Sequence, residues 1–380
     1  MNFYRKLFLF LCCLSLNSNI SNAIESAITK DNLPYFYKNL KEDITFPLGW
    51  KDNESDFYSW KKKGLRKAKE FIVPNLKKFN FNMKIIDEID RGSYIAQKII
   101  FNTDTEVTTS ALLLVPKGKG PFPAALMLHD HGAKFDIGKE KMVMPWGDEN
   151  KITSAKDWSK KYFSSLFPGD ELAKRGYVVL SFDALGWGDR QGNGYEAQQA
   201  LASNLFNLGT SYASIIAQED MKAAEFLSSL PQVDSNKVAA IGFSMGAFRA
   251  WQVAALSDDI TAAISICWMA TLKGLMVEGN NQLKGQSAYT MLHPYLVKYM
   301  DYPDIASLAA PKPMLFFSGE KDTLFPKESV IRAFNKMKKV WQASNSEENF
   351  TYKFWNKGHV FEKDQQIEAF EWLDKKFKNN

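Results

Sequence analysis

The stretch VAAIGFSMG, Val238 to Gly246, decides the fold of this chain. Its apolar first half is typical of a buried strand, and residues 247–255 after it can form a helix. Glycines two residues before and two after Ser244 remove the β-carbons that would crowd so sharp a strand-to-helix turn. The pattern therefore predicts a nucleophile elbow, a turn that lifts the Ser244 hydroxyl into a cleft.

A serine hydroxyl is a weak nucleophile at neutral pH and needs a histidine base that is oriented by a carboxylate. The alternating, β-rich run 350–355 predicts a strand, and the turn after it ends in His359. A terminal helix is expected from about 364 to 377. We therefore predict His359 as the base that takes the proton of Ser244.

The carboxylate is expected on a loop that follows a strand between the elbow and the histidine. Residues 313–318 match a short buried strand, and the loop at its carboxyl end carries Asp322. Glu320 and Asp301 are alternative carboxylates. With Asp322 as the acid, the chain order is Ser, Asp, His, which is the order of α/β-hydrolases.

Acyl transfer also needs two N–H donors that stabilise a tetrahedral oxyanion. The backbone amide of Met245, directly after the nucleophile, is expected to supply one. The other is expected from the loop HDHGA, residues 129–133, which follows the predicted strand 124–128. We assign it to Ala133, with Gly132 shaping the turn.

The same loop raises the alternative of a metal site, because His129 and His131 flank Asp130. A protein zinc site usually needs a third ligand group at matching spacing, and the sequence offers none. We therefore predict no metal.

Further residues are expected on the walls of the substrate pocket, because they lie on segments that follow predicted strands. For tryptophan, plain packing is the alternative. For Arg190, the alternative to substrate binding is an internal ion pair with Asp183 or Asp189. The predicted substrate-binding residues are His131, Trp146, Trp187, Arg190, Trp268 and His293.

Apolar, strand-like segments alternate with helix-like segments through most of the chain. Such alternation predicts an α/β protein with a mostly parallel twisted sheet and helices on both faces. The β-rich runs 93–101 and 108–115 predict an antiparallel hairpin that precedes this sheet. The remaining predicted strands are 124–128, 177–182, 238–243, 262–266, 314–317 and 352–355.

The chain divides into an amino-terminal extension and a catalytic domain. Residues 24–84 are polar, with one expected helix at 56–71, and are predicted to pack on the catalytic body. The catalytic domain, 85–380, contains two connections too long for simple crossovers, at about 132–172 and 269–310. Both leave the carboxyl ends of strands, where ligands bind in open α/β sheets, so we expect them to form the rim of the pocket.

Residues 1–23 are predicted to be a signal peptide. Arg5 and Lys6 precede the apolar run 7–16, and small residues stand before a cleavage point near Ala23. A single-pass anchor is the alternative, but the apolar run is short for a bilayer. We predict export to the periplasm or the exterior.

Composition limits the classes of partner. Cleavage at Ala23 removes two positive charges and lowers the formal net charge from +5 to +3, which gives no basis for nucleic-acid binding. No membrane association is expected after cleavage, and the oligomeric state is left open. Cys267 would be the only remaining cysteine, and it is expected to be a buried small hydrophobe without a disulfide partner.

Four motifs together resemble bacterial α/β-hydrolases of the dienelactone hydrolase-like group, near the acetyl xylan esterases. They are HDHGAKF at 129–135 with GKE at 138–140, DALGWGDR at 183–190, GFSMG at 242–246, and APKP at 310–313 leading to Asp322. The resemblance spans about Lys84 to the end. It implies an exported Ser-Asp-His carboxylesterase that acts on carbohydrate esters without a cofactor. Dienelactone hydrolases proper use cysteine as nucleophile, so Ser244 favours ester cleavage over lactone opening.

The predicted function is therefore a secreted serine carboxylesterase, with acetylated polysaccharides or oligosaccharides as the preferred substrates. A serine peptidase of the prolyl oligopeptidase type shares the fold and the triad. Such enzymes usually carry an amino-terminal propeller, and the roughly 60 polar residues before the hairpin are too few for one. A non-catalytic carbohydrate-binding protein that keeps the hydrolase fold is the alternative from another class.

Overall fold

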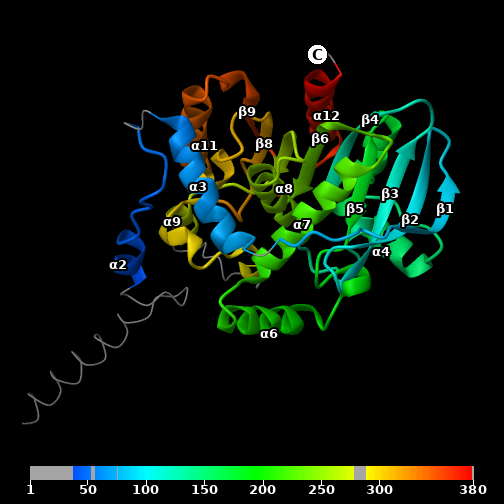
Figure 1. Cartoon of the computed structure of the whole chain (residues 1–380), viewed down its shortest axis with the longest axis horizontal. Helices are drawn as coiled ribbons and strands as arrows, with labels where there is room; N and C mark the ends of the chain where they lie inside the picture. Colours follow the sequence, from blue (N-terminus) through cyan, green and yellow to red (C-terminus); the bar gives the residue numbers. More distant parts are fainter. Residues whose placement is uncertain (1–36, 53–55, 75, 278–287, 379–380) are drawn as a thin grey trace, which may run out of the picture.

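One mixed sheet forms the body of the protein. The computed structural model describes residues 37–52, 56–74, 76–277 and 288–378, and the predicted signal peptide lies outside these residues. Within them, nine strands pair in the order β1-β2-β3-β5-β4-β6-β7-β8-β9 (Figure 1). The strands are β1 (Lys84–Asp90), β2 (Tyr94–Asn102), β3 (Thr108–Pro116), β4 (Phe122–Leu128), β5 (Val178–Phe182), β6 (Val233–Phe243), β7 (Ala262–Ile266), β8 (Met314–Gly319) and β9 (Phe350–Trp355).

The sheet is antiparallel at one end and parallel through the rest. The pairs β1–β2, β2–β3 and β3–β5 are antiparallel, and they form the end of the sheet at the right of Figure 1. From β5 through β4 and β6 to β9 every pair is parallel. This confirms the predicted hairpin and the predicted mostly parallel sheet. Strand β1 was not predicted, because nearly all its side chains are exposed and its pattern has no buried face.

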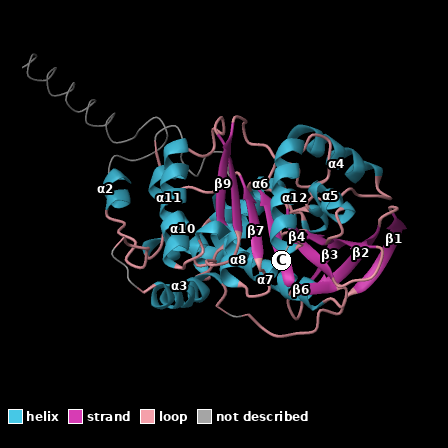
Figure 2. Ribbon diagram, turned by 90° about the horizontal axis from the view of Figure 1, so that it is seen from above, coloured by secondary structure: helices cyan, strands magenta, loops and turns pink. Residues whose placement is uncertain are grey.

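Helices cover both faces of the sheet (Figure 2). Helices α3, α7, α8, α10 and α11 bury their apolar residues in one hydrophobic layer, and α4, α5 and α12 bury theirs in the other. Alternate residues of each central strand enter opposite layers, which is why these strands are apolar along their whole length. The helices are α2 (Tyr37–Glu42), α3 (Phe57–Ile72), α4 (Glu149–Tyr162), α5 (Pro168–Lys174), α6 (Gly194–Asn207), α7 (Tyr212–Ser229), α8 (Met245–Leu256), α9 (Leu272–Leu275), α10 (Tyr302–Ser307), α11 (Lys327–Ala343) and α12 (Lys363–Phe377).

The amino-terminal segment packs on this body through α3. The predicted helix 56–71 agrees with α3, and Asp56 caps it by accepting a hydrogen bond from the backbone N–H of Ser59 at 2.9 Å. The apolar side of the helix buries Phe57 and Trp60, and the Trp60 ring lies edge-on to Trp50 with ring centroids 5.1 Å apart.

No helix among the described residues combines the length and apolar character that crossing a membrane requires.

The two long connections both leave the carboxyl end of the parallel strands. The first, between β4 and β5, contains the short 3-10 helix η1 (Lys139–Lys141), then α4 and α5. The second, between β7 and β8, contains α9 and α10, and its residues 278–287 lie outside the described part. Side chains on these connections and on the short turns after β6, β8 and β9 therefore gather at one edge of the sheet.

Candidate active site

Ser244 occupies the tight turn between β6 and α8. Its backbone has φ 55° and ψ −123°, a conformation that a residue with a β-carbon rarely adopts. A β-carbon at Gly242 would lie 2.1 Å from the main chain of Gly246, and one at Gly246 would lie 1.9 Å from the carbonyl oxygen of Leu128. Both glycines are therefore required by close backbone contacts, and the turn has the geometry of a nucleophile elbow.

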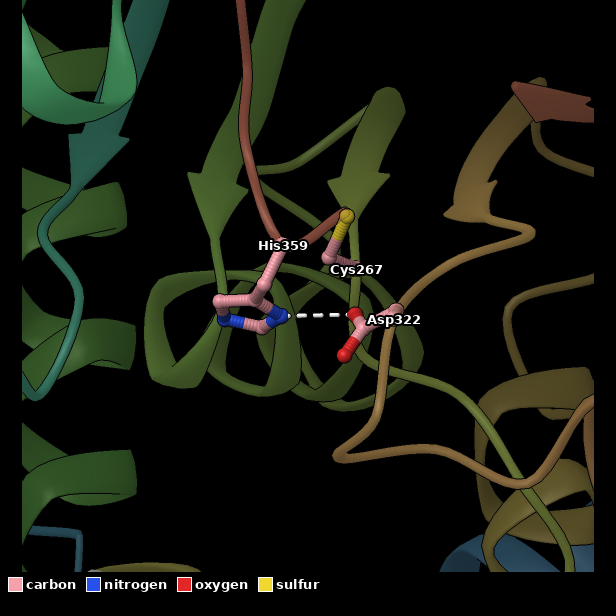
Figure 3. A group of neighbouring side chains, drawn as sticks. All are labelled: Cys267, Asp322 and His359. Atoms are coloured by element: carbon pink, nitrogen blue, oxygen red, sulfur yellow. Dashed lines mark hydrogen bonds and ion pairs between the residues drawn. The ribbon is translucent and has the colours of Figure 1, made fainter. Parts of the chain in front are cut away.

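His359 and Asp322 meet as the sequence predicted. Nδ1 of His359, on the loop after β9, lies 2.7 Å from Oδ2 of Asp322, on the loop after β8 (Figure 3). The Asp322 side chain is fully buried, and its Oδ1 accepts a hydrogen bond from the backbone N–H of Leu324 at 2.9 Å. The His359 ring stacks on Phe325 at a centroid distance of 6.3 Å. Because Nδ1 faces the carboxylate, Nε2 is the ring nitrogen left for a reacting partner.

Ser244 and His359 line the same cavity, whose volume is about 170 Å³. Among the described residues, no direct hydrogen bond joins the serine hydroxyl to the histidine ring, a bond that is often long in unliganded enzymes. Asp322 lies behind His359, away from the cavity lining. The lining residues are Asp130, His131, Gly132, Ala133, Trp158, Tyr162, Tyr195, Phe243, Ser244, Leu324 and His359.

The predicted oxyanion residues also converge here. Gly132 and Ala133 line the cavity, and Gly132 has φ +43° with no room for a β-carbon, which would lie 2.3 Å from the Trp158 ring. Met245 is the first residue of α8. The first N–H groups of a helix have no acceptor within it, so the Met245 amide is free of the helix ladder.

His131 lines the cavity as a neutral side chain. It is buried, its Nε2 lies 2.9 Å from Oε1 of Gln198, and its ring stacks on Tyr195. Burial lowers the pKa of His131 to about 4, so the ring is uncharged at neutral pH. It shapes the wall of the site beside Ser244.

Two predicted wall residues on the loop after β5 lie outside the cavity. Trp187 is fully buried, and its Nε1 donates a 2.6 Å hydrogen bond to the carbonyl of His131. Arg190 forms an internal ion pair, but with Glu219 at 2.6 Å and not with the side chain of Asp183 or Asp189. It also donates to the backbone carbonyl of Asp183 at 3.1 Å. Both residues therefore stabilise the loop after β5 through internal contacts and do not face the cavity.

Three other predicted wall residues lie elsewhere as well. Trp268 is buried and its Nε1 lies 2.9 Å from the sulfur of Met291, and buried His293 bonds Gln252 through Nε2 at 2.5 Å. Trp146 donates a 2.8 Å hydrogen bond to Asp87 and lines a separate cavity against β2 and β3. The structure does not bring these side chains to the cavity of Ser244.

The aromatic residues that do line the cavity were not predicted from the sequence. Trp158 and Tyr162 lie one turn apart on α4, and Tyr195 lies at the start of α6. The i, i+4 spacing of two aromatic residues in a rim insertion is a signal that could have suggested a shared helix face. Which way that face points depends on how the insertion packs, and the sequence does not state this.

The donor atoms at the site suit a catalytic pair better than a metal. The thiol of Cys267 lies close to Asp322 and His359, and potential ligand atoms of the three are within 4.8 Å of one another (Figure 3). Burial raises the pKa of the Cys267 thiol well above its ordinary value, so the thiol keeps its proton. The other two groups, Nδ1 of His359 and Oδ2 of Asp322, already bind each other at 2.7 Å.

The histidines of the 129–133 loop do not form a metal site either. His129 is buried, its Nδ1 donates to the carbonyl of Asp130 at 2.8 Å, and its Nε2 accepts the N–H of Ala184 at 3.1 Å. The His129 ring is therefore fully hydrogen-bonded within the fold. Nε2 of His131 is likewise bound to Gln198. The contacts of the two rings therefore do not support the alternative of a metal site in this loop.

Comparison with known proteins gives a family and structural relatives. The family model described as the dienelactone hydrolase family matches residues 167–376. YtaP of Bacillus subtilis (strain 168), provisionally named a hydrolase, is 27% identical over 253 residues, which cover 66% of this chain and 78% of YtaP. These matches confirm the resemblance inferred from the motifs.

Two solved structures have the same fold. A Bacteroides fragilis protein provisionally named an acetyl xylan esterase superposes with a TM-score of 0.70 at 16% identity, covering 86% of this chain and 84% of the other. A glucuronoyl esterase from Solibacter usitatus superposes with a TM-score of 0.60 at 13% identity, covering 92% of this chain and 96% of the other. At such low identity the likeness speaks for the fold, and it confirms the α/β-hydrolase class.

Proposed function

Because the chain belongs to the dienelactone hydrolase family and is a hydrolase, we propose that it cleaves carboxylic esters with Ser244 as nucleophile. His359 is the base in this proposal and Asp322 the acid. The observation that carries it is the 2.7 Å contact between Nδ1 of His359 and Oδ2 of Asp322 at a cavity that His359 shares with Ser244.

The proposed reaction has two steps. Nε2 of His359 takes the proton of Ser244 as the serine oxygen attacks the ester carbonyl, and Asp322 stabilises the imidazolium that forms. The protonated ring then gives its proton to the departing alkoxide, which leaves an acyl group on Ser244. A water molecule, deprotonated by the same ring nitrogen, attacks this acyl-enzyme and releases the acid and the free serine.

The negative charge that develops on the carbonyl oxygen is stabilised by backbone N–H groups. The Met245 amide at the start of α8 is one proposed donor, and the amide of Ala133 in the cavity wall is the other. Losing one such donor costs about 100-fold to 1,000-fold in kcat. The conformation of the 129–133 loop is therefore part of the proposed catalytic apparatus.

The size of the cavity favours a small acyl group. Pockets for drug-sized ligands measure roughly 300–1,000 Å³, whereas the cavity at Ser244 measures about 170 Å³. An acetyl group fits this scale, and the alcohol part of the ester would then extend outward along the aromatic rim formed by Trp158, Tyr162 and Tyr195. Aromatic faces suit sugar rings.

We propose acetylated polysaccharides or oligosaccharides as the substrate class, with the protein exported by the segment 1–23 to the periplasm or the exterior. The names of the structural relatives, an acetyl xylan esterase and a glucuronoyl esterase, agree with a carbohydrate ester. That support is an analogy between folds. The chemistry of the proposal depends on the geometry at Ser244.

Kinetics of Ser244→Ala test the proposal, with p-nitrophenyl acetate and acetylated xylo-oligosaccharides as substrates. We expect the variant to keep the fold and lose turnover by about 10⁴-fold or more, because the nucleophile acts as a unit with its base. Undiminished hydrolysis by the variant would refute the proposal. A panel of acetyl, feruloyl and methyl glucuronoyl esters, with a prolyl peptide added, then ranks the acyl groups and tests the peptidase alternative.

A further inference from the structure

Three consecutive charged residues are buried on the connection between β4 and β5, and the last of them, Lys141, contacts residues that line the cavity at Ser244. Lys139, Glu140 and Lys141 form the 3-10 helix η1, and their exposed fractions are 4%, 3% and 0%. Charged side chains are almost never fully buried unless they are paired. The proposed mechanism gives none of these three residues a task, so their burial calls for another explanation.

Lys139 and Lys141 hold different loops. Lys139 Nζ lies 2.7 Å from Asp183 and 2.9 Å from Asp189, both on the loop after β5. Lys141 Nζ instead donates to the backbone carbonyl of His131 at 2.9 Å and to that of Asp130 at 3.3 Å. Lys141 therefore acts directly on the loop that supplies the proposed oxyanion donor.

The surroundings of Lys141 keep a cation at this position. The carboxylate of Asp130 lies 3.6 Å from Nζ, and the ring of Trp158 lies 4.8 Å away, with its Nε1 donating to the same carboxylate at 3.0 Å. Burial lowers the pKa of the Lys141 ammonium, and the charge of Asp130 opposes that shift. Lys141 is therefore held, without solvent contact, by an ion pair with Asp130 and by two main-chain carbonyls.

The carbonyl contacts fix the direction of the next amide. Because a trans peptide is planar, the C=O of His131 and the N–H of Gly132 point in opposite directions. Lys141 and Nε1 of Trp187, at 2.6 Å, both bind this carbonyl. Neither lines the cavity, whereas Gly132 and Ala133 do. Holding the His131 carbonyl on the side away from the cavity fixes the plane of the peptide that precedes Gly132, one residue before the proposed Ala133 donor, and a cation at the carbonyl polarises that peptide.

We propose that Lys141 is a positioning residue that aligns the 129–133 loop for oxyanion stabilisation. The inference rests on the proposed ester hydrolysis at Ser244. It also connects the two motifs HDHGAKF and GKE, since the lysine that directly follows the second motif binds the backbone of the first.

A purely structural role is the competing explanation, and Lys312 provides the control for it. Lys312 is partly buried, and its Nζ donates to two main-chain carbonyls, those of Ala254 at 2.9 Å and Ser257 at 2.7 Å. These carbonyls lie at the carboxyl end of α8, about 15 to 20 Å along the helix from Ser244 at 1.5 Å per residue. Lys312→Met thus removes an equivalent lysine far from the reacting atoms.

The experiment compares Lys141→Met with Lys312→Met in the full-length enzyme. Both should lower the melting temperature, but only Lys141→Met should lower kcat per folded enzyme for p-nitrophenyl acetate, by about 100-fold and with KM nearly unchanged. The affinity for methylboronic acid, whose serine adduct is tetrahedral, should fall in parallel. Lys141→Gln keeps a donor without the charge and should recover part of kcat.

Equal kcat in the folded Lys141→Met and Lys312→Met enzymes would overturn the proposal. If Lys141→Met does not fold, Trp187→Phe removes the other donor to the same carbonyl, and an unchanged kcat in that variant would overturn it as well. Failure of the proposed ester hydrolysis at Ser244 can be told apart from failure of the role of Lys141. In the first case, Ser244→Ala itself retains its esterase activity.

Discussion

At the scale of single residues, the site combines strain with anchoring. Ser244 has φ 55° and Cys267, at the end of the next strand, has φ 61°. Each such conformation costs on the order of 1–3 kcal/mol and persists only where the surroundings over-determine it. The N–H of Ser244 donates to the carbonyl of Ile266 at 2.8 Å, and that of Cys267 to Phe317 at 2.8 Å. Ladder bonds between strands thus hold both strained residues beside His359 and Asp322.

The role of Asp322 is tested by Asp322→Asn. The amide keeps the size of the side chain but presents no carboxylate to Nδ1–H of His359, so the ring loses its orientation and tautomer. We expect kcat for p-nitrophenyl acetate to fall by about 10⁴-fold while the protein stays folded. Steady-state kinetics and circular dichroism measure the two quantities.

Glu320 provides the matched control for this substitution. It was the alternative carboxylate on the same loop, and the structure pairs it with Lys327 at 2.8 Å near the surface. Glu320→Gln should therefore leave kcat unchanged. A large loss of kcat in Glu320→Gln, together with normal kcat in Asp322→Asn, would show that the carboxylate of the triad is assigned to the wrong residue.

The sequence could supply the three reacting residues but not most of the pocket wall. Ser244, Asp322 and His359 each follow a recognisable strand, and parallel strands bring such positions to one edge whatever the loops do. Trp187 and Trp268 also follow strands, yet their rings turn into the core. A tryptophan in a sequence reveals its size and not the side of the chain on which it packs.

At the scale of elements, prediction succeeded where burial imposes a pattern. The core strands are apolar because both faces are covered, and the predicted 262–266 coincides with β7. Strand β1 escaped detection because it is an exposed edge strand held mainly by backbone pairing with β2. The direction in which α4 presents Trp158 and Tyr162 depends on long-range packing of an insertion, which local periodicity does not encode.

The contact between the elbow and β4 leads to a prediction at this scale. A β-carbon at Gly246 would lie 1.9 Å from the carbonyl oxygen of Leu128, so Gly246→Ala must push the start of α8 away from the strand. A displacement of about 1 Å can cost 100-fold in rate. We expect Gly246→Ala to lose at least this much of kcat/KM and to fold with lower stability.

Gly358 is the control, because it adjoins His359 but has room. A β-carbon there would meet its nearest neighbour, the carbonyl oxygen of Lys321, at 3.9 Å, an ordinary contact distance. Gly358→Ala should therefore retain most of the activity. If Gly246→Ala is as active as Gly358→Ala, the close packing of the elbow on β4 is not what positions Ser244.

At the scale of the whole molecule, buried neutral histidines link stability to pH. Burial lowers the pKa of His293 to about 3 and that of His131 to about 4, below the ordinary value of 6.5. The unfolded chain therefore binds more protons than the folded protein between about pH 7 and these values. Stability is complete above the unfolded pKa and decreases as pH falls through this window, by about 1.4 kcal/mol for each unit of pKa difference.

His293→Phe tests this linkage away from the catalytic cavity. The variant is expected to be less stable overall, because Gln252 loses its 2.5 Å partner. Its free energy of unfolding should nevertheless decline less than that of the parent between pH 7.5 and pH 4.5. Urea unfolding at a series of pH values measures the two slopes. Identical slopes would mean that His293 is not a buried neutral group.

The central claim is that Ser244 is activated by His359 and Asp322, and covalent labelling tests it most directly. The parent, Ser244→Ala and His359→Gln would be treated with a fluorophosphonate and analysed by peptide mass spectrometry. The account predicts one adduct, on the peptide that carries Ser244, absent from Ser244→Ala and formed far more slowly in His359→Gln. An esterase-active parent that stays unlabelled at Ser244, or that carries the adduct on another residue, would contradict it.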